Sequence, residues 1–201
     1  MDFKEEYDMG IKPLLRITAV LVILVGSLVL YRTPPLNTGT ISEHTGVASE
    51  YLKTKGQIIS YLSHLSEDTV LVERIADAVL VEASEQGVPP GVTVAIMAHE
   101  NGSLTPDGVS TAGAVGLMQV MPLHVPIEEC GLLTTKDLSN VEINICAGVH
   151  IFVEKLERCN DSTKCALLAY NGCIVTNEPF RTCYNYPTKV EENLLDFLSE
   201  A

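Results

Sequence analysis

The chain has 201 residues, 46% of them hydrophobic, and a formal net charge of −13. This length suffices for one domain of ordinary size with accessory segments, and the apolar content can supply its core. An acidic chain without basic clusters argues against a nucleic-acid partner and against tight electrostatic docking to anionic lipid. Residues 1–32 carry four acids and four bases, so the excess acid lies beyond them.

The N-terminal segment predicts a membrane anchor. Residues 1–13 are polar and mixed in charge, and residues 14–31 are apolar with Arg16 as their single charge. A helix of this length spans about 27 Å, close to the hydrocarbon thickness of a bilayer. The basic residues before the span favour a cytoplasmic tail and an exported C-terminal part. We expect a retained transmembrane signal-anchor; a cleaved signal peptide and a buried helix of a soluble protein are the alternatives.

Turn-forming residues separate this apolar segment from the rest of the chain. Residues 32–46 are rich in Thr, Pro and Gly, which is typical of a linker. Residues 47–201 are therefore predicted to form one exported domain. Its first expected helix covers residues 47–65, although Gly56 weakens it.

Two stronger helical patterns lead to a candidate catalytic acid. Ser66 can cap a helix whose apolar residues recur at helical spacing until Gly87 stops it. A Val-Pro-Pro turn follows, and Pro90 or Gly91 opens an apolar helix. This second helix is expected to end near Glu100.

The second half of the chain is also predicted to be mainly helical. Residues 123–136 have the composition of a loop, and residues 137–158 form the longest expected helix of the domain. Only residues 115–120 offer a pattern that resembles a strand. The sequence thus predicts a helical domain with loops.

Two shorter helices complete the predicted domain. Ser162 or Thr163 can start a helix that ends at Gly172. Residues 175–187 are irregular in pattern. Residues 189–198 form a final amphipathic helix.

Six cysteines lie between residues 130 and 183, and no two have the Cys-x-x-Cys spacing of a zinc or redox site. An even number at wide spacing favours disulfides in an oxidising compartment, which agrees with an exported domain. Free buried thiols and, least favoured, metal binding are the alternatives. The simplest pairing joins nearest neighbours: Cys130 with Cys146, Cys159 with Cys165, and Cys173 with Cys183.

The stretch from residue 98 to residue 122 carries the candidate chemistry. On a helix, Glu100 shares a face with Ile96 and Met97. Desolvation by such neighbours raises the pKa of a carboxyl group and keeps it protonated, as a general acid requires. A solvated glutamate at a helix end is the alternative interpretation.

Glycines and a lone amide follow this acid. Gly113 and Gly116 let backbone segments approach closely. Gln119 lies within an apolar run, so its amide needs partners, which a sugar hydroxyl or acetamido group can supply. A core amide satisfied by the protein itself is the alternative.

Residues 113–122, Gly-Ala-Val-Gly-Leu-Met-Gln-Val-Met-Pro, closely resemble the signature of lytic transglycosylases with the soluble-transglycosylase (SLT) catalytic domain. The resemblance runs from about Ser66 to Val190 and implies a lysozyme-like fold, mainly α with a small β part. By this resemblance Glu100 takes the place of the single catalytic acid. The residues that it assigns to substrate binding are Ser110, Gln119, Met121, Tyr170 and Asn171.

Later segments are similar to the same family in the same order. Asn144, Gly148 and Phe152 resemble its following helix. Residues 169–172, Ala-Tyr-Asn-Gly, are similar to a closing element whose tyrosine lies close to the catalytic acid. Residues 186–190 resemble the pattern before the last helix.

The sequence departs from the family pattern at three points. Asn101 stands where a serine usually follows the glutamate. The spacing from Glu100 to Ser110 is one residue longer than usual, which weakens the assignment of Ser110. The alanine usually found between Asn171 and Gly172 is missing.

The resemblance implies cleavage of the β-1,4 bond between N-acetylmuramic acid and N-acetylglucosamine in peptidoglycan, with a 1,6-anhydro end and no cofactor. Such a reaction needs one carboxylate, whereas ordinary glycosidases pair two. Asp107 is the candidate second acid, and we expect it to be solvated. If Asp107 reaches the site, a goose-type lysozyme-like hydrolase becomes the better interpretation. The five histidines show no ligand spacing, so no metal site is predicted.

A catalytically inactive, membrane-anchored structural or adaptor component is a third alternative, against which Glu100, Gln119 and Tyr170 argue. The expected partners are peptidoglycan strands and, through the N-terminal helix, a membrane. We expect the catalytic domain in the periplasm or otherwise outside the cytoplasm, or on a virion membrane. Local opening of the cell wall would suit a secretion apparatus or phage entry, with the corresponding complex as partner.

Overall fold

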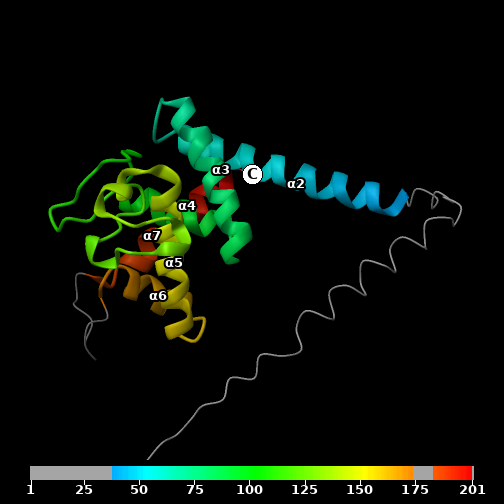
Figure 1. The fold of residues 1–201 in the computed structure, drawn as a ribbon. Coiled ribbons are helices and arrows are strands. Elements are labelled where there is room, and N and C mark those ends of the chain that lie inside the picture. Colours follow the sequence, from blue (N-terminus) through cyan, green and yellow to red (C-terminus); the bar gives the residue numbers. More distant parts are fainter. Residues whose placement is uncertain (1–37, 174–182, 201) are drawn as a thin grey trace, which may run out of the picture. The chain divides into compact units, whose positions relative to one another are not determined.

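The structure is a computed structural model that describes residues 38–173 and 183–200. The chain divides into two compact units, Met1–Glu43 and His44–Ala201, and the second contains the candidate site. The predicted tail and transmembrane segment lie outside the described residues. Among the helices that are described, none is both long and apolar enough to cross a membrane. Figure 1 follows the elements in chain order.

Helix α2 spans Thr38–Ser63 and begins earlier than the predicted residue 47. Residues 38–46, expected to be linker, are therefore helical. Within the second unit, the C-terminal half of α2 buries Ile58 and Leu62 completely. These two residues are four apart and lie on one face of the helix, so this face anchors α2 to the core.

Helix α3 spans Thr69–Gln86 and ends, as predicted, at Gly87 with a left-handed φ of 70°. Its cap is Asp68 rather than the predicted Ser66, and the Asp68 side chain accepts a 3.0 Å hydrogen bond from the Leu71 N–H. Ser66 Oγ instead accepts from the Asp68 N–H at 3.2 Å. A carboxylate is an equally good cap and adds favourable charge at a helix N-terminus.

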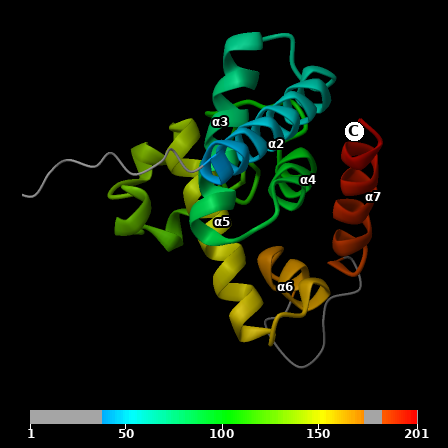
Figure 2. The same ribbon diagram turned by 90° about the vertical axis from the view of Figure 1, so that its right-hand side faces the viewer.

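Helices α4 (Pro90–Glu100) and α7 (Tyr186–Ser199) pack against one another. Figure 2 shows the two helices side by side. Gly91 permits the contact, because a Cβ there would lie 2.8 Å from the ring of Phe197. Helix α4 has the predicted limits, whereas α7 begins three residues before the predicted residue 189.

Helix α5 spans Val141–Arg158 and packs between α3 and α6 (Thr163–Tyr170). It begins later than the predicted residue 137 because Asn140 caps it, accepting from the Ile143 N–H at 3.1 Å. The preceding residues, Thr135–Ser139, form the 3-10 helix η3. Two further 3-10 turns interrupt the predicted loop before η3: η1 (Pro122–His124) and η2 (Glu128–Cys130).

Two of the three predicted disulfides are present. Cys130–Cys146 ties η2 to α5, and Cys159–Cys165 closes the turn between α5 and α6. The third predicted pair is not formed in the structure, where Cys173 and Cys183 carry free thiols. Cys173 is fully buried, and the amide of Asn171 lies 3.4 Å from its Sγ.

The described residues contain isolated β-bridges but no extended strand. Val115 bridges to Val120 and to Val109, and Ile127 bridges to Leu132. The stretch 115–120, which resembled a strand in the sequence, is therefore a tight turn whose ends pair with each other.

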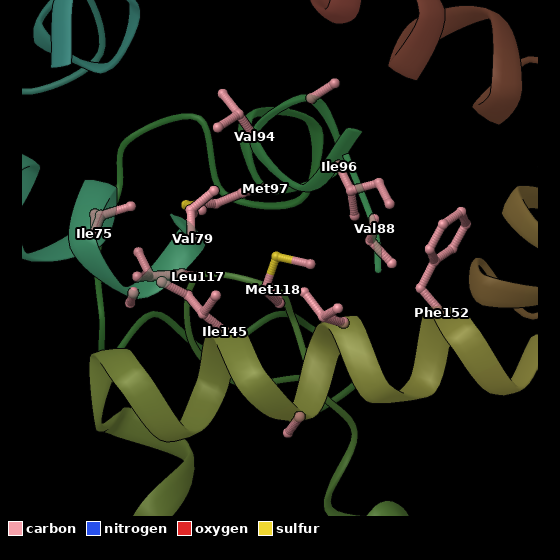
Figure 3. Packing of buried hydrophobic residues seen from close by; sticks show 14 of the residues in the cluster. Ile75, Val79, Val88, Val94, Ile96, Met97, Leu117, Met118, Ile145 and Phe152 are labelled. Atoms are coloured by element: carbon pink, nitrogen blue, oxygen red, sulfur yellow. The ribbon is translucent and has the colours of Figure 1, made fainter. Parts of the chain in front are cut away.

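The core places this turn between helices. Leu117 and Met118 are fully buried, and their side chains lie between α4 and α5 (Figure 3). Gly148 on α5 permits this, because a Cβ there would overlap Met118. The turn is consequently held against the helix that carries Glu100.

Candidate active site

Glu100 is the last residue of α4, and its side chain is partly buried. The chain leaves the helix at Asn101, whose N–H donates to the Met97 carbonyl at 2.8 Å. From the start of α7, the Tyr186 hydroxyl donates a 2.5 Å hydrogen bond to Glu100 Oε1. The packing of α4 against α7 thus holds the carboxyl group in place.

Burial sets the protonation of this site. It raises the pKa of Glu100, and the hydrogen bond from Tyr186 offsets part of that effect because it stabilises the carboxylate. Burial, with the negative charge of Glu100 and the nearby Tyr170, also raises the pKa of Tyr186. The Tyr186 hydroxyl therefore keeps its proton and acts as a donor, while Glu100 can hold or release one.

Tyr170, which the resemblance placed near the acid, lies in the same cleft but does not bond to Glu100. Its hydroxyl donates to the Met118 carbonyl at 2.8 Å. Burial, followed by the charge of Glu100, raises the pKa of Tyr170 well above its usual value. Tyr170 thus fixes the glycine-rich turn, and Tyr186 is the tyrosine in contact with the acid.

Asn101 connects the acid to the loop that follows. Its side chain is buried, and its Nδ2 donates to the carbonyls of Thr105 at 2.7 Å and Gly116 at 3.1 Å. Its Oδ1 accepts from the Thr105 N–H at 3.1 Å. The amide therefore joins the end of α4, the polar loop and the glycine-rich turn.

Gln119 has a positive φ of 48°, and its Nε2 donates to Gly116 O at 2.9 Å and Gly108 O at 3.3 Å. The protein thus satisfies the amide nitrogen. Among the described residues, none donates to its Oε1. That oxygen remains available to accept a hydrogen bond from a ligand.

A buried asparagine on α5 holds the glycine-rich turn in place through hydrogen bonds to its backbone. Asn144 Oδ1 accepts from the Met118 N–H at 2.8 Å, and its Nδ2 donates to the carbonyls of Val115 and Leu138. Gly116, with φ of 83°, leaves room for this amide, which a Cβ would overlap. The glycine is therefore required both by its backbone conformation and by the close approach of Asn144.

These elements enclose an open cleft of about 440 Å³. Glu100 is the only acid of the described residues that lines it; Asp107 is exposed and lies outside. Every residue that the sequence assigned to catalysis or substrate binding lines this cleft: Glu100, Ser110, Gln119, Met121, Tyr170 and Asn171. Within the described ranges, no group of three or more His, Cys, Asp and Glu side chains is placed to hold a metal ion.

The family model of the transglycosylase SLT domain matches residues 77–186, a range that contains Glu100, Gln119 and Tyr186. This chain belongs to the transglycosylase SLT domain family. In fold, its SLT domain resembles the X-ray structure of an inactive variant of the lytic transglycosylase Slt from Pseudomonas aeruginosa. The TM-score is 0.53 at 21% identity, over 62% of this chain and 24% of that protein's chain. Among curated proteins no sequence matches.

The SLT domain closes the turn after Tyr170 with one residue fewer than the usual pattern. Gly172 takes a left-handed φ of 69°, and the Cys173 N–H donates to the Leu168 carbonyl at 2.9 Å. Cys173 is fully buried directly behind this turn. The shortened turn is thus a regular helix ending, and it leaves Asn171 exposed at the cleft.

Sequence reasoning missed Tyr186 as a residue of this SLT site. It was identified only as part of the pattern before the last helix. The available signal was a tyrosine directly before Pro187, which fits the first turn of a helix and so places the ring at a helix start. Nothing local in the sequence indicates that this helix start faces the end of α4.

Proposed function

We propose that this SLT domain is a peptidoglycan lytic transglycosylase. It cleaves the β-1,4 bond between N-acetylmuramic acid and N-acetylglucosamine and leaves a 1,6-anhydromuramyl end. Family membership supports the substrate class, and the residues of the cleft support the reaction. The observation that carries the proposal is a single partly buried carboxyl group, the only acid of the described residues that line the cleft, which accepts a hydrogen bond from a neutral tyrosine.

One carboxyl group suffices if it acts first as a general acid and then as a general base. Protonated Glu100 gives its proton to the glycosidic oxygen as the bond from that oxygen to the muramyl C1 breaks. The muramyl 6-hydroxyl then attacks C1, and its proton passes to the Glu100 carboxylate. The acid is regenerated, and no water is consumed.

The surrounding groups would position the strand for this step. Gln119 Oε1 can accept a hydrogen bond from a sugar hydroxyl or an acetamido N–H. Ser110 and Asn171 offer further polar contacts at the cleft wall. Because backbone contacts fix Gln119 in place, little ordering is needed when the sugar binds.

Replacing the acid by its amide tests this proposal. Glu100→Gln keeps the shape of the side chain but removes its proton transfer, and we expect a loss of at least about 100-fold in peptidoglycan clearing. Asp107→Asn is the matched control, because this exposed acid lies outside the cleft. Clearing that depends equally on both residues would support a two-carboxylate hydrolase. Clearing that survives Glu100→Gln would refute the mechanism.

The product identifies the reaction class. Mass spectrometry of the released muropeptides separates anhydro ends from reducing ends, because the two differ by one water. We expect anhydro ends from the native chain. Reducing ends would assign the same site to a goose-type lysozyme-like hydrolase, and no release at all would favour an inactive adaptor.

We also propose that the N-terminal apolar segment anchors this enzyme so that it opens the wall locally, with the SLT domain outside the cytoplasm. Its hydropathy and the basic residues before it support this arrangement. Protease protection of the tail but not of the SLT domain in spheroplasts is the expected result. Locating the chain in purified virions or in a secretion complex would decide between phage entry and secretion.

A further inference from the structure

Two basic side chains of the described residues line the cleft and take no part in bond cleavage. Lys155 comes from the last turn of α5, and His124 ends η1. Lys155 is the only lysine or arginine among the described residues of the cleft wall. Because the chain has a net charge of −13, acidic residues outnumber basic ones, and the composition alone does not explain a lysine in the cleft wall.

Lys155 pairs with no acid of the described residues. Its neighbour Glu154 lies 3.8 Å from both His150 and Arg158 instead. The Lys155 side chain is partly buried and lines the cleft, and a lysine in such a position can cover apolar wall with its stem while it presents its ammonium group to an anion.

His124 lies within electrostatic reach of this lysine. Burial, followed by the positive charge of Lys155, lowers the pKa of His124, and Glu154 opposes the effect. A neutral imidazole beside an ammonium group supplies a hydrogen bond without adding like charge. Together the two side chains offer one full charge and one directional hydrogen bond, which is the chemistry that recognises a carboxylate.

We propose that Lys155, assisted by His124, binds a carboxylate of the muramyl strand and so selects muramyl strands over uncharged N-acetylglucosamine polymers. This inference rests on the proposed function. The carboxylate comes from the lactyl group of a muramyl unit or from the peptide that the group carries. An N-acetylglucosamine polymer has the same backbone linkage but no carboxylate, so it gains nothing from the lysine.

Binding to the full chain in neutral detergent tests this, with Glu100→Gln as the parent so that no strand is cleaved. Isothermal titration calorimetry would compare three ligands: an N-acetylglucosamine tetramer, a peptide-free glycan fragment with its lactyl carboxylates, and the same fragment with its peptides. Lys155→Met removes the charge and keeps most of the stem. Lys164→Met is the matched control, because Lys164 is exposed on α6 and lines no part of the cleft.

We expect Lys155→Met to weaken a carboxylated ligand by about 3- to 10-fold, the scale of one partly exposed charge-assisted contact. The tetramer should bind as before, and Lys164→Met should change nothing. A loss confined to the peptide-free fragment assigns the lactyl carboxylate, and a loss confined to the peptide-bearing fragment assigns the peptide. Added salt should reduce the difference between parent and variant.

Equal weakening of all three ligands, or no weakening of either carboxylated ligand, would overturn the inference. The proposed function is judged separately, from the anhydro products of the chain with Glu100 intact. If those products form and Lys155→Met binds like its parent, only the inference fails. If the parent binds neither carboxylated ligand, the inference fails, and the proposed function fails only if the intact chain also releases no anhydro products.

Discussion

Glu100 and Tyr186 are separated by 86 positions in the sequence, yet their contact sets the chemistry of the cleft. Burial favours the protonated acid, and the tyrosine hydroxyl favours the carboxylate. Because the pKa of Glu100 is raised in the folded state, that state binds more protons than the unfolded chain between the two pKa values. The contribution of Glu100 to stability is therefore complete below the unfolded pKa and is lost as pH rises through the folded one.

Removing the Tyr186 hydroxyl tests how burial and the hydrogen bond together set the pKa of Glu100. Tyr186→Phe deletes the donor that stabilises the carboxylate, so the pKa of Glu100 should rise further and the alkaline limb of the pH–rate profile should move to higher pH. The carboxyl group also loses its positioning contact, and we expect a fall of about tenfold in kcat. Rates of peptidoglycan clearing across a pH series measure both effects.

Tyr184→Phe is the control for this variant, because Tyr184 is exposed two residues earlier. It should leave the profile unchanged. An alkaline limb that stays in place in Tyr186→Phe would mean that the hydroxyl does not tune the acid. A shift of equal size in Tyr184→Phe would mean that any change in the chain just before α7 moves the limb, and not the loss of the Tyr186 hydroxyl.

At the scale of elements, the site depends on how closely the glycine-rich turn approaches α5. Gly148→Ala would place a methyl group into Met118, so the turn or the helix must move. We expect the free energy of unfolding to fall by about 1–3 kcal/mol, as in other overpacked cores. Activity should fall as well, because Gln119 follows Met118 directly. Thermal unfolding by circular dichroism and a clearing assay measure these two results.

Gly56→Ala provides the matched comparison. No atom lies within 4 Å of the Cβ that it would add on α2. The same substitution there should stabilise the protein by about 0.5–1 kcal/mol through helix propensity and a less flexible unfolded chain. Two Gly→Ala changes with effects of equal sign would contradict the packing argument.

Much of this arrangement was predictable from local patterns. The limits of α4 and the glycine that ends α3 follow from capping and periodicity, and six residues of the cleft wall follow from the resemblance to one specific signature. The first turns of other helices were less certain, because a cap can be chosen among several polar residues. Helix α3 is capped by Asp68 rather than by Ser66. Helix α5 is capped by Asn140 and so begins after the predicted residue 137.

Contacts between distant segments were not predictable in the same way. The sequence suggested that a sugar would satisfy the Gln119 amide, but the carbonyls of Gly108 and Gly116 already bind its nitrogen. The contact of Tyr186 with the acid arises only when α7 packs on α4. Patterns within one helix report which face is buried, and they carry no information on which side chain of another helix meets it.

At the scale of the whole molecule, the two disulfides contribute to the stability of the fold. Cys130–Cys146 closes 16 positions of sequence separation, and Cys159–Cys165 closes 6. The chain-entropy model gives about 3 kcal/mol for the longer loop and about 2 kcal/mol for the shorter one. For a domain of ordinary stability, either loss is a large fraction of the total. An oxidising compartment therefore suits this domain, in agreement with the proposed export.

Replacing each disulfide separately tests these two contributions to stability. The double variant Cys130→Ala/Cys146→Ala should lose about 3 kcal/mol of unfolding free energy, and Cys159→Ala/Cys165→Ala about 2 kcal/mol. Cys183→Ser is the control, because its thiol is free and only partly buried, so a change within about 0.5 kcal/mol is expected. Urea unfolding of each variant, with and without reductant, gives the values.

A loss for Cys183→Ser as large as that of the double variants would mean that Cys183 is bonded after all, as nearest-neighbour pairing predicted. Equal stability of the native chain with and without reductant would remove the argument for an oxidising compartment, since neither bridge would then contribute to the stability of the domain.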